Sequence, residues 1–239
     1  MKAVKSMNTL PVRNVLNAGM LEGFAATGMR PAHQARSREL VIRLFNEGLA
    51  LLNDVDFDGL SIETLCHRTG STVGAFYSRF ENKDAFVNAL QRIVVVGARR
   101  EIYANYENAS WETLDQLIGA VARGAALWYR RHEGLVRASL RRANGERDMW
   151  TPLRELGELN ISCALPRILT FLPPQAHDGA VDRIRLAFQM LFGTLNNIVQ
   201  VNPGPFTLED RRTAPFIAEA MTGFIRAGDR RADGAGPTG

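Results

Sequence analysis

Residues 61–83 read SIETLCHRTGSTVGAFYSRFENK and hold two short helical patterns with almost no room between them. The first pattern opens with a serine that can cap a helix, and it places apolar side chains at the spacing of one helix face. Gly70 follows at the place where helices end in a left-handed residue, and a hydroxyl side chain can cap the next helix two residues later. The stretch therefore predicts two helices, at residues 61–69 and 73–80, joined by a tight turn.

The second of these helices combines an apolar face with a small, polar outer face. Phe76 and Phe80 lie four residues apart, so both can pack on the first helix. The small residues Gly74 and Ala75 let the backbone approach a surface closely. Such a helix can enter the DNA major groove and offer hydrogen-bond donors and methyl groups to base edges. The candidate DNA-contacting residues are Ser61, Thr64, Ser71, Thr72, Val73, Gly74, Tyr77, Ser78, Arg79 and Lys83.

Lys83 lies in the first turn of the next helix, which Asn82 can cap. A lysine in a first turn opposes the helix dipole, and a phosphate lying across the helix end would explain it. The net charge of +4 permits a polyanionic partner without requiring one. Residues 35–106 contain nine Arg or Lys and nine Asp or Glu, so the prediction of DNA binding rests on the placement of charges and not on their sum.

Residues 69–84, TGSTVGAFYSRFENKD, resemble the helix-turn-helix signature of the TetR family of transcriptional regulators, and the resemblance extends over residues 38–90. It implies an all-α fold, in which an N-terminal three-helix DNA-binding module precedes a larger helical domain for effector binding and dimerisation. It also implies a homodimer that joins through the last two long helices and reads a palindromic operator in double-stranded DNA. In the family, the residues equivalent to Tyr77 and Lys83 contact the DNA backbone.

Helical periodicity continues on both sides of this motif. Residues 37–53 predict one helix before it, and residues 83–106 predict a long connecting helix after it. Neither β-strand alternation nor an apolar run of membrane-spanning length is found, so we expect no membrane contact. Further helices are expected at residues 111–131, 132–143, 149–172, 178–201 and 208–227, which gives about nine helices in total.

The chain is expected to divide into four segments. Residues 1–34 are expected to form a flexible arm, which either adds phosphate or minor-groove contacts or is a disordered extension; we favour the extension. Residues 35–82 would form the DNA-binding domain, and residues 83–228 the effector-binding and dimerisation domain. The Gly-rich residues 229–239 are expected to be a disordered tail.

The large helical domain offers two kinds of candidate effector contact. Aromatic side chains could line a pocket, although aromatic residues at helical spacing more often belong to a core. A cluster of arginines between residues 130 and 147 could bind an anionic small molecule or could be a solvated face. The candidate ligand-binding residues are Trp128, Arg137, Phe171, Phe188 and Phe192.

Patterns for catalysis and for metal binding have little support. The four histidines lie in unlike contexts, and the Asp-rich residues 53–59 lack the spacing and the terminal glutamate of a calcium loop. Cys66 and Cys163 are expected to be free thiols in a reducing cytoplasm. We therefore expect no catalytic residues, no cofactor and no metal site, and we favour a ligand-responsive cytoplasmic repressor. The alternatives are an all-helical enzyme of transferase type and, third, an architectural or adaptor protein.

Overall fold

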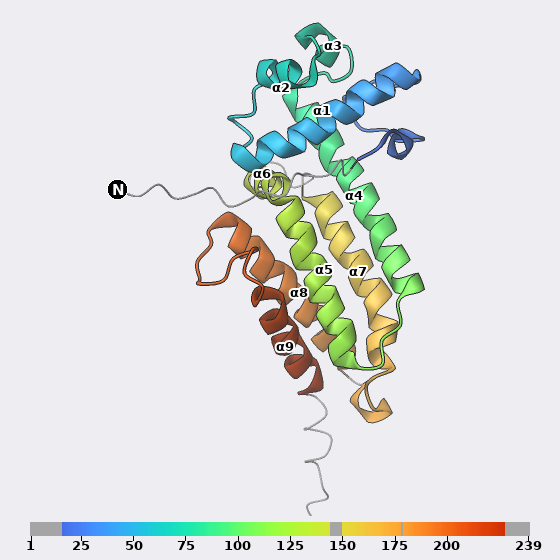
Figure 1. Cartoon of the computed structure of the whole chain (residues 1–239). Coiled ribbons are helices and arrows are strands. Elements are labelled where there is room, and N and C mark those ends of the chain that lie inside the picture. Colours follow the sequence, from blue (N-terminus) through green and yellow to red (C-terminus); the bar gives the residue numbers. More distant parts are fainter. Residues whose placement is uncertain (1–15, 144–149, 178, 228–239) are drawn as a thin grey trace, which may run out of the picture. The chain divides into compact units, whose positions relative to one another are not determined.

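The structure is a computed structural model that describes residues 16–143, 150–177 and 179–227. All regular elements in these residues are helices, apart from one isolated β-bridge, and the predicted all-α fold is confirmed (Figure 1). The chain forms two compact units, Met1–Ile93 and Val94–Gly239. The division falls inside the helix α4 (Lys83–Asn108), and not at residue 82 where the sequence placed it.

The first unit contains α1 (Ala35–Asp54), α2 (Ile62–Thr69), α3 (Val73–Tyr77) and the beginning of α4. Both α2 and α3 begin with the predicted side-chain caps. The Ser61 side chain accepts a hydrogen bond from the backbone N–H of residue 64, and the Thr72 side chain accepts one from the backbone N–H of residue 75. Gly70 ends α2 in the left-handed region at φ 62°, where a residue with a Cβ would be strained. Local chemistry therefore sets this turn.

The helix α3 ends at Tyr77, three residues before the predicted end at Phe80. The backbone of Phe80 instead forms an antiparallel bridge with Met29, which lies before α1. The side chain of Phe80 is nevertheless fully buried, as its spacing from Phe76 predicts. The periodicity thus identified the buried face correctly but not the end of the helix, because the bridge partner is distant in sequence.

Four fully buried phenylalanines form the centre of the first unit: Phe45, Phe76, Phe80 and Phe86. Their ring centroids lie 5.1 to 5.7 Å apart, in tilted or edge-on pairs. Gly48 of α1 allows this packing, because a Cβ there would lie 2.7 Å from Phe86 Cζ. The cluster joins α1, α3 and α4, so the exposed face of α3 is supported by an aromatic core.

The prediction of a flexible arm is wrong for residues 16–34, whereas residues 1–15 and the expected tail at 229–239 lie outside the described residues. Leu16 has an exposed fraction of only 2%, and Met20 and Leu21 are buried as well. The last two belong to a short 3-10 helix, η1 (Ala18–Leu21), which packs on α1. These three apolar side chains give the segment a face that it can bury, although it contains no long apolar run.

In its described residues, the second unit contains the rest of α4 and five further α-helices, of which α5, α8 and α9 lie side by side (Figure 1). Their bounds are α5 (Leu114–Arg131), α6 (Glu133–Ala143), α7 (Thr151–Leu169), α8 (Ala180–Gln200) and α9 (Thr213–Arg226). The helix α9 begins five residues later than predicted, because Asp210 bonds to Thr207 and Arg212 in the turn before it. No helix of the described part is long and apolar enough to cross a membrane.

Candidate nucleic-acid interface and ligand cavity

The outer side of α3 presents five neighbouring exposed residues, all of them predicted DNA contacts. Val73 and Tyr77 are large hydrophobic residues, yet their exposed fractions are 36% and 47%. Thr72, Gly74 and Ser78 are exposed beside them. The surface therefore offers methyl groups, hydroxyl groups and a position without a side chain, which are the features that a helix needs to read base edges in a major groove.

The predicted contacts at the edges of this surface have local partners. The Ser61 hydroxyl donates to Glu63 Oε2 at 2.9 Å in addition to capping α2. Hydrogen bonding from the Glu63 backbone, and then from Ser61, holds the pKa of the Glu63 carboxyl below its usual value. The Ser71 hydroxyl lies 2.9 Å from that of Thr69, whereas Thr64 is exposed. Ser61 therefore stabilises the start of α2, and Ser71 stabilises the turn that positions α3.

Arg79 and Lys83, the two predicted basic contacts, donate hydrogen bonds to backbone carbonyl groups. Arg79 Nη1 lies 3.2 Å from Pro31 O. Lys83 Nζ lies 3.1 Å from Phe57 O and 3.3 Å from Asp58 O, and 4.6 Å from the centroid of the Phe57 ring. These contacts explain a lysine at the start of α4 without any phosphate, so the position of Lys83 is not by itself a sign of DNA binding.

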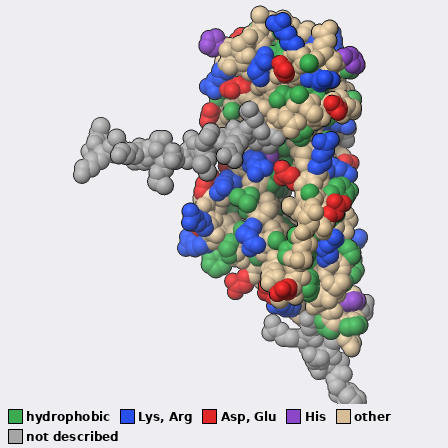
Figure 2. Space-filling model, turned by 45° about the vertical axis from the view of Figure 1, so that its right-hand side comes forward, with side chains coloured by type: hydrophobic (Ala, Val, Ile, Leu, Met, Phe, Trp, Pro, Cys, Tyr) green, Lys and Arg blue, Asp and Glu red, His purple; other side chains and the backbone are tan. Residues whose placement is uncertain are grey.

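Charged side chains of both signs are interspersed on the face shown in Figure 2. Some are paired, as Arg68 Nη1 is with Glu47 Oε1 at 3.1 Å. A surface pair of this kind is worth at most about 1 kcal/mol, so its arginine remains available to a phosphate. The case for a DNA interface consequently rests on the shape and composition of α3 and not on a continuous positive patch.

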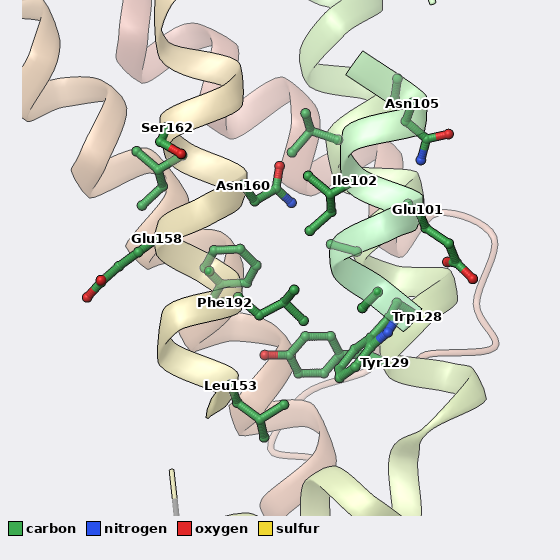
Figure 3. A pocket seen from close by; sticks show the side chains of 18 of the residues that line it. Glu101, Ile102, Asn105, Trp128, Tyr129, Leu153, Glu158, Asn160, Ser162 and Phe192 are labelled. Atoms are coloured by element: carbon green, nitrogen blue, oxygen red, sulfur yellow. The ribbon is translucent and has the colours of Figure 1, made fainter. Parts of the chain in front are cut away.

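The second unit contains a cavity of about 1430 Å³, with walls from α4, α5, α7 and α8. Figure 3 shows Trp128 and Tyr129 of α5 and Phe192 of α8 around it, with Ile102 of α4 and Leu153 of α7. The volume exceeds that of ordinary ligand pockets, and the lining is mostly aromatic and aliphatic. The arrangement can therefore enclose a large, mainly apolar small molecule.

Two of the five predicted ligand-binding residues, Trp128 and Phe192, line this cavity, and the other three do not. Phe188 is fully buried in the core of the second unit, and Phe171 packs against that core. Arg137 Nη1 forms an ion pair with Glu133 Oε1 at 3.0 Å, one turn earlier on α6. Helical spacing could not show which of these residues line the cavity and which lie in the core, because both kinds of side chain recur with the same helical period.

The sequence missed two tyrosine–asparagine pairs in the cavity wall. Tyr106 Oη donates to Asn160 Oδ1 at 2.9 Å, and Tyr129 Oη donates to Asn196 Oδ1 at 2.9 Å. Burial raises the pKa of both tyrosines, so their hydroxyl groups stay protonated. Because each asparagine uses its oxygen to accept this bond, its amide N–H groups are left as donors. In Figure 3, Asn160 points from α7 towards α4.

Both carboxylates that line the cavity are ion-paired. Glu101 Oε1 lies 3.6 Å from Arg131 Nη1, and Glu158 Oε1 lies 3.5 Å from Arg154 Nη1. Figure 3 shows the Glu158 side chain pointing away from the cavity. Two more arginines, Arg123 and Arg185, belong to the lining, so the charged groups around the cavity have a positive surplus.

Residues 44–90 match the family model described as "Bacterial regulatory proteins, tetR family". Among solved structures, Salmonella enterica GusR is similar, with 13% identity over 79% of this chain and 96% of that chain, at a TM-score of 0.54. A TetR transcriptional regulator from Rhodococcus sp. RHA1 is 14% identical over 84% of this chain and 100% of that chain, at a TM-score of 0.45. A search of the curated proteins gave no match.

At these identities the likeness to GusR shows the fold alone, while the family match falls on the helix-turn-helix itself. The matched residues contain all of α2 and α3, with the capped turn at Gly70 and the exposed face from Thr72 to Ser78. Residues 44–90 of this chain therefore form a helix-turn-helix region of the kind found in the tetR family of bacterial regulatory proteins.

Proposed function

We propose that the protein is a ligand-responsive repressor in the cytoplasm, which binds a palindromic operator as a homodimer and is released by a small-molecule effector. The observation that carries this proposal is the helix α4, which belongs to both units. Its first turns bury Phe86 and Leu90 in the first unit, and its later turns place Ile102 and Asn105 in the cavity lining.

The continuity of α4 provides a route for the effector to act on DNA binding. A ligand in the cavity would contact Ile102 and Asn105, and a shift of these turns would act on Phe86 through the same helix. Phe86 packs on Phe76 of α3, with 5.4 Å between ring centroids. An effector that binds one arrangement of α4 better than another would thereby shift the population of DNA-competent molecules.

The lining of the cavity supports an effector that is mostly apolar, carries hydrogen-bond acceptors and is neutral or anionic. The asparagine amides at residues 160 and 196 are donors, and both lining carboxylates are already paired. In a thermal unfolding assay, aromatic ketones or aromatic carboxylates are expected to raise the unfolding midpoint of the second unit. Stabilisation by aromatic quaternary ammonium compounds alone would contradict this charge preference.

The dimer proposal rests on an apolar face that α8 and α9 leave exposed. Leu186 and Met190 are exposed one turn apart on α8, Val201 is exposed directly after α8, and Phe216 is exposed on α9. A Cβ added at Gly193 would meet no atom within 4 Å. A second copy of the chain would cover this face and hold two recognition helices about 34 Å apart, one turn of DNA. A monomeric mass by light scattering at micromolar concentration would remove the symmetric-operator proposal.

The direct test is a titration of the protein against DNA fragments from the promoter regions of its own gene and of the neighbouring genes. Tyr77→Phe is expected to raise the Kd for the bound fragment about tenfold, equivalent to about 1.4 kcal/mol, with an unchanged unfolding midpoint. Lys83→Ala is expected to raise the Kd and also to lower the midpoint, because Lys83 Nζ holds two loop carbonyls.

The two variants distinguish a residue that only contacts DNA, as expected for Tyr77, from one that also stabilises the fold, as expected for Lys83. Unchanged affinity in both would show that α3 docks on DNA in another way. If the unmodified protein binds every fragment equally weakly or not at all, the repressor proposal fails. A loss of binding as salt rises is expected, because phosphate contacts release counterions.

A further inference from the structure

Residues 16–34, which we call the strap, are attached to the rest of the first unit at two places. The first attachment is at Leu16, whose side chain is buried. Leu16 N donates to Asn46 Oδ1 at 3.3 Å, and Asn46 Nδ2 donates to Leu16 O at 3.2 Å. A single half-buried side chain of α1 therefore satisfies both backbone groups of Leu16, which fixes the start of the strap.

The second attachment is at the residues that directly follow the recognition helix α3. Arg30 N donates to Arg79 O at 2.8 Å, and Glu81 N donates to Gly28 O at 3.0 Å. Arg79 Nη1 adds a bond to Pro31 O at 3.2 Å. Three hydrogen bonds thus join the strap to residues 79–81, which belong to the connection between α3 and α4.

Gly28 allows the strap to come this close. Its φ is +72°, and a Cβ there would lie 2.6 Å from Ala85 Cβ and 3.2 Å from Glu81 Oε2. The strap also contains a second glycine with the same backbone conformation, Gly23 at φ +69°, around which a Cβ would meet nothing within 4 Å. An alanine at either position would therefore have the same backbone strain. Only an alanine at residue 28 would also clash with the residues that follow α3.

We propose that the strap is a positioning element for the recognition helix, which holds the C-terminal end of α3 in the orientation that reads DNA. The helix α3 has five residues, too few to be stable without tertiary contacts. Phe76 fixes α3 from the core side, and the strap fixes the segment that leaves it. The predicted effect on DNA affinity rests on the DNA-binding role proposed above, whereas the predicted effect on local order does not.

Gly28→Ala and Gly23→Ala, both in the whole 239-residue chain, form a matched pair for the test. In the DNA-free protein, hydrogen exchange of the backbone amides of Arg30 and Glu81 is expected to be at least about tenfold faster in Gly28→Ala and unchanged in Gly23→Ala. The Kd for the operator fragment is expected to rise about tenfold in Gly28→Ala and less than about twofold in Gly23→Ala. The slope of log Kd against log salt is expected to stay the same, since no phosphate contact is removed.

Three outcomes would overturn the proposal. The first is equal exchange of the Glu81 amide in both variants. The second is equal Kd values in both variants alongside normal binding by the unmodified protein. The third is a salt slope reduced by about one or more with unchanged exchange, which would make the strap a direct DNA contact. If the unmodified protein binds no fragment, the repressor proposal fails, and the exchange measurement still decides whether the strap holds α3.

If Gly28→Ala does not fold, Asn46→Ala tests the same proposal from the other attachment. It removes both hydrogen bonds to Leu16 and leaves Gly28 and the bridge intact. We expect Asn46→Ala to speed the exchange of the Glu81 amide and to raise the Kd, both by less than Gly28→Ala does. Exchange and affinity both equal to those of the unmodified protein would show that the strap does not act on α3.

Discussion

Phe86→Ala is expected to lower the free energy of unfolding of the first unit by about 3–5 kcal/mol, the usual loss for a large aromatic side chain removed from a core. Phe86 is fully buried and lies within 5.7 Å, centroid to centroid, of Phe45, Phe76 and Phe80. Its removal leaves a cavity that α1, α3 and α4 would all have to close, and Gly48 contributes no side chain that could fill it. Denaturant unfolding followed by a probe in the first unit measures the loss.

Phe86→Leu is the control for this experiment, because it keeps a buried apolar side chain and removes mainly the aromatic shape. Its expected cost is about 1–2 kcal/mol. The alanine variant is also expected to lose DNA binding at temperatures where its first unit is unfolded. A cost below about 1 kcal/mol for Phe86→Ala would show that the four-phenylalanine cluster is not what supports α3.

The second large effect is a loss of stability at acidic pH caused by His132. This side chain has an exposed fraction of 3%, and its Nδ1 has no hydrogen-bond partner among the described residues. Its ring centroid lies 4.9 Å from that of Trp128. Burial, and then the positive charge of Arg131, lowers the pKa of His132 to about 3 from an ordinary value of 6.5.

The sign of the effect follows from which state binds the proton. Between pH 6.5 and about 3 the unfolded chain protonates this histidine and the folded chain does not, so stability is present above pH 6.5 and is lost as the pH falls. The expected slope is at most about 1.4 kcal/mol for each pH unit. The measurement is the unfolding free energy at about pH 7, 5.5 and 4.5, for the unmodified protein and for His132→Phe.

Phenylalanine at residue 132 keeps a ring against Trp128 and cannot take up a proton. The difference in unfolding free energy between the two proteins isolates the histidine, since carboxylates that titrate in the same range contribute to both. That difference is expected to be constant above pH 7 and to grow in favour of the variant below about pH 6.5. Parallel curves over the whole range would contradict the prediction, because they would show that His132 binds its proton equally well in the folded and unfolded states.

Much of the helix-turn-helix could be predicted because its determinants are local. The Ser61 and Thr72 caps each bond to a backbone group three residues away, and Gly70 takes the left-handed conformation that its position demands. The family resemblance over residues 38–90 agrees with the matched residues 44–90 for the same reason. The four helices after α5 were predicted from helical periodicity. Their predicted ends were wrong mainly where side chains form hydrogen bonds within a turn, as Asp210 does before α9.

The contacts that could not be predicted join residues far apart in the chain. Lys83 bonds to carbonyls 25 and 26 residues away, which is why a phosphate looked necessary in the sequence alone. The tyrosine–asparagine pairs of the cavity wall span 54 and 67 residues, on helices whose packing no local spacing reveals. Trp128 and Phe192 were identified as candidates, yet the same reasoning also selected Phe188, a core residue.

The sequence by itself determined the two short helices, the turn at Gly70 and the exposed residues of α3, because caps, glycine conformation and helical period act within a few residues. Only the tertiary structure decided which aromatic side chains enclose a cavity, which atoms Lys83 contacts, and that residues 16–34 are a strap and not a free arm. These features depend on hydrogen bonds and packing between segments 25 or more residues apart, where no local pattern records which partner a side chain will meet.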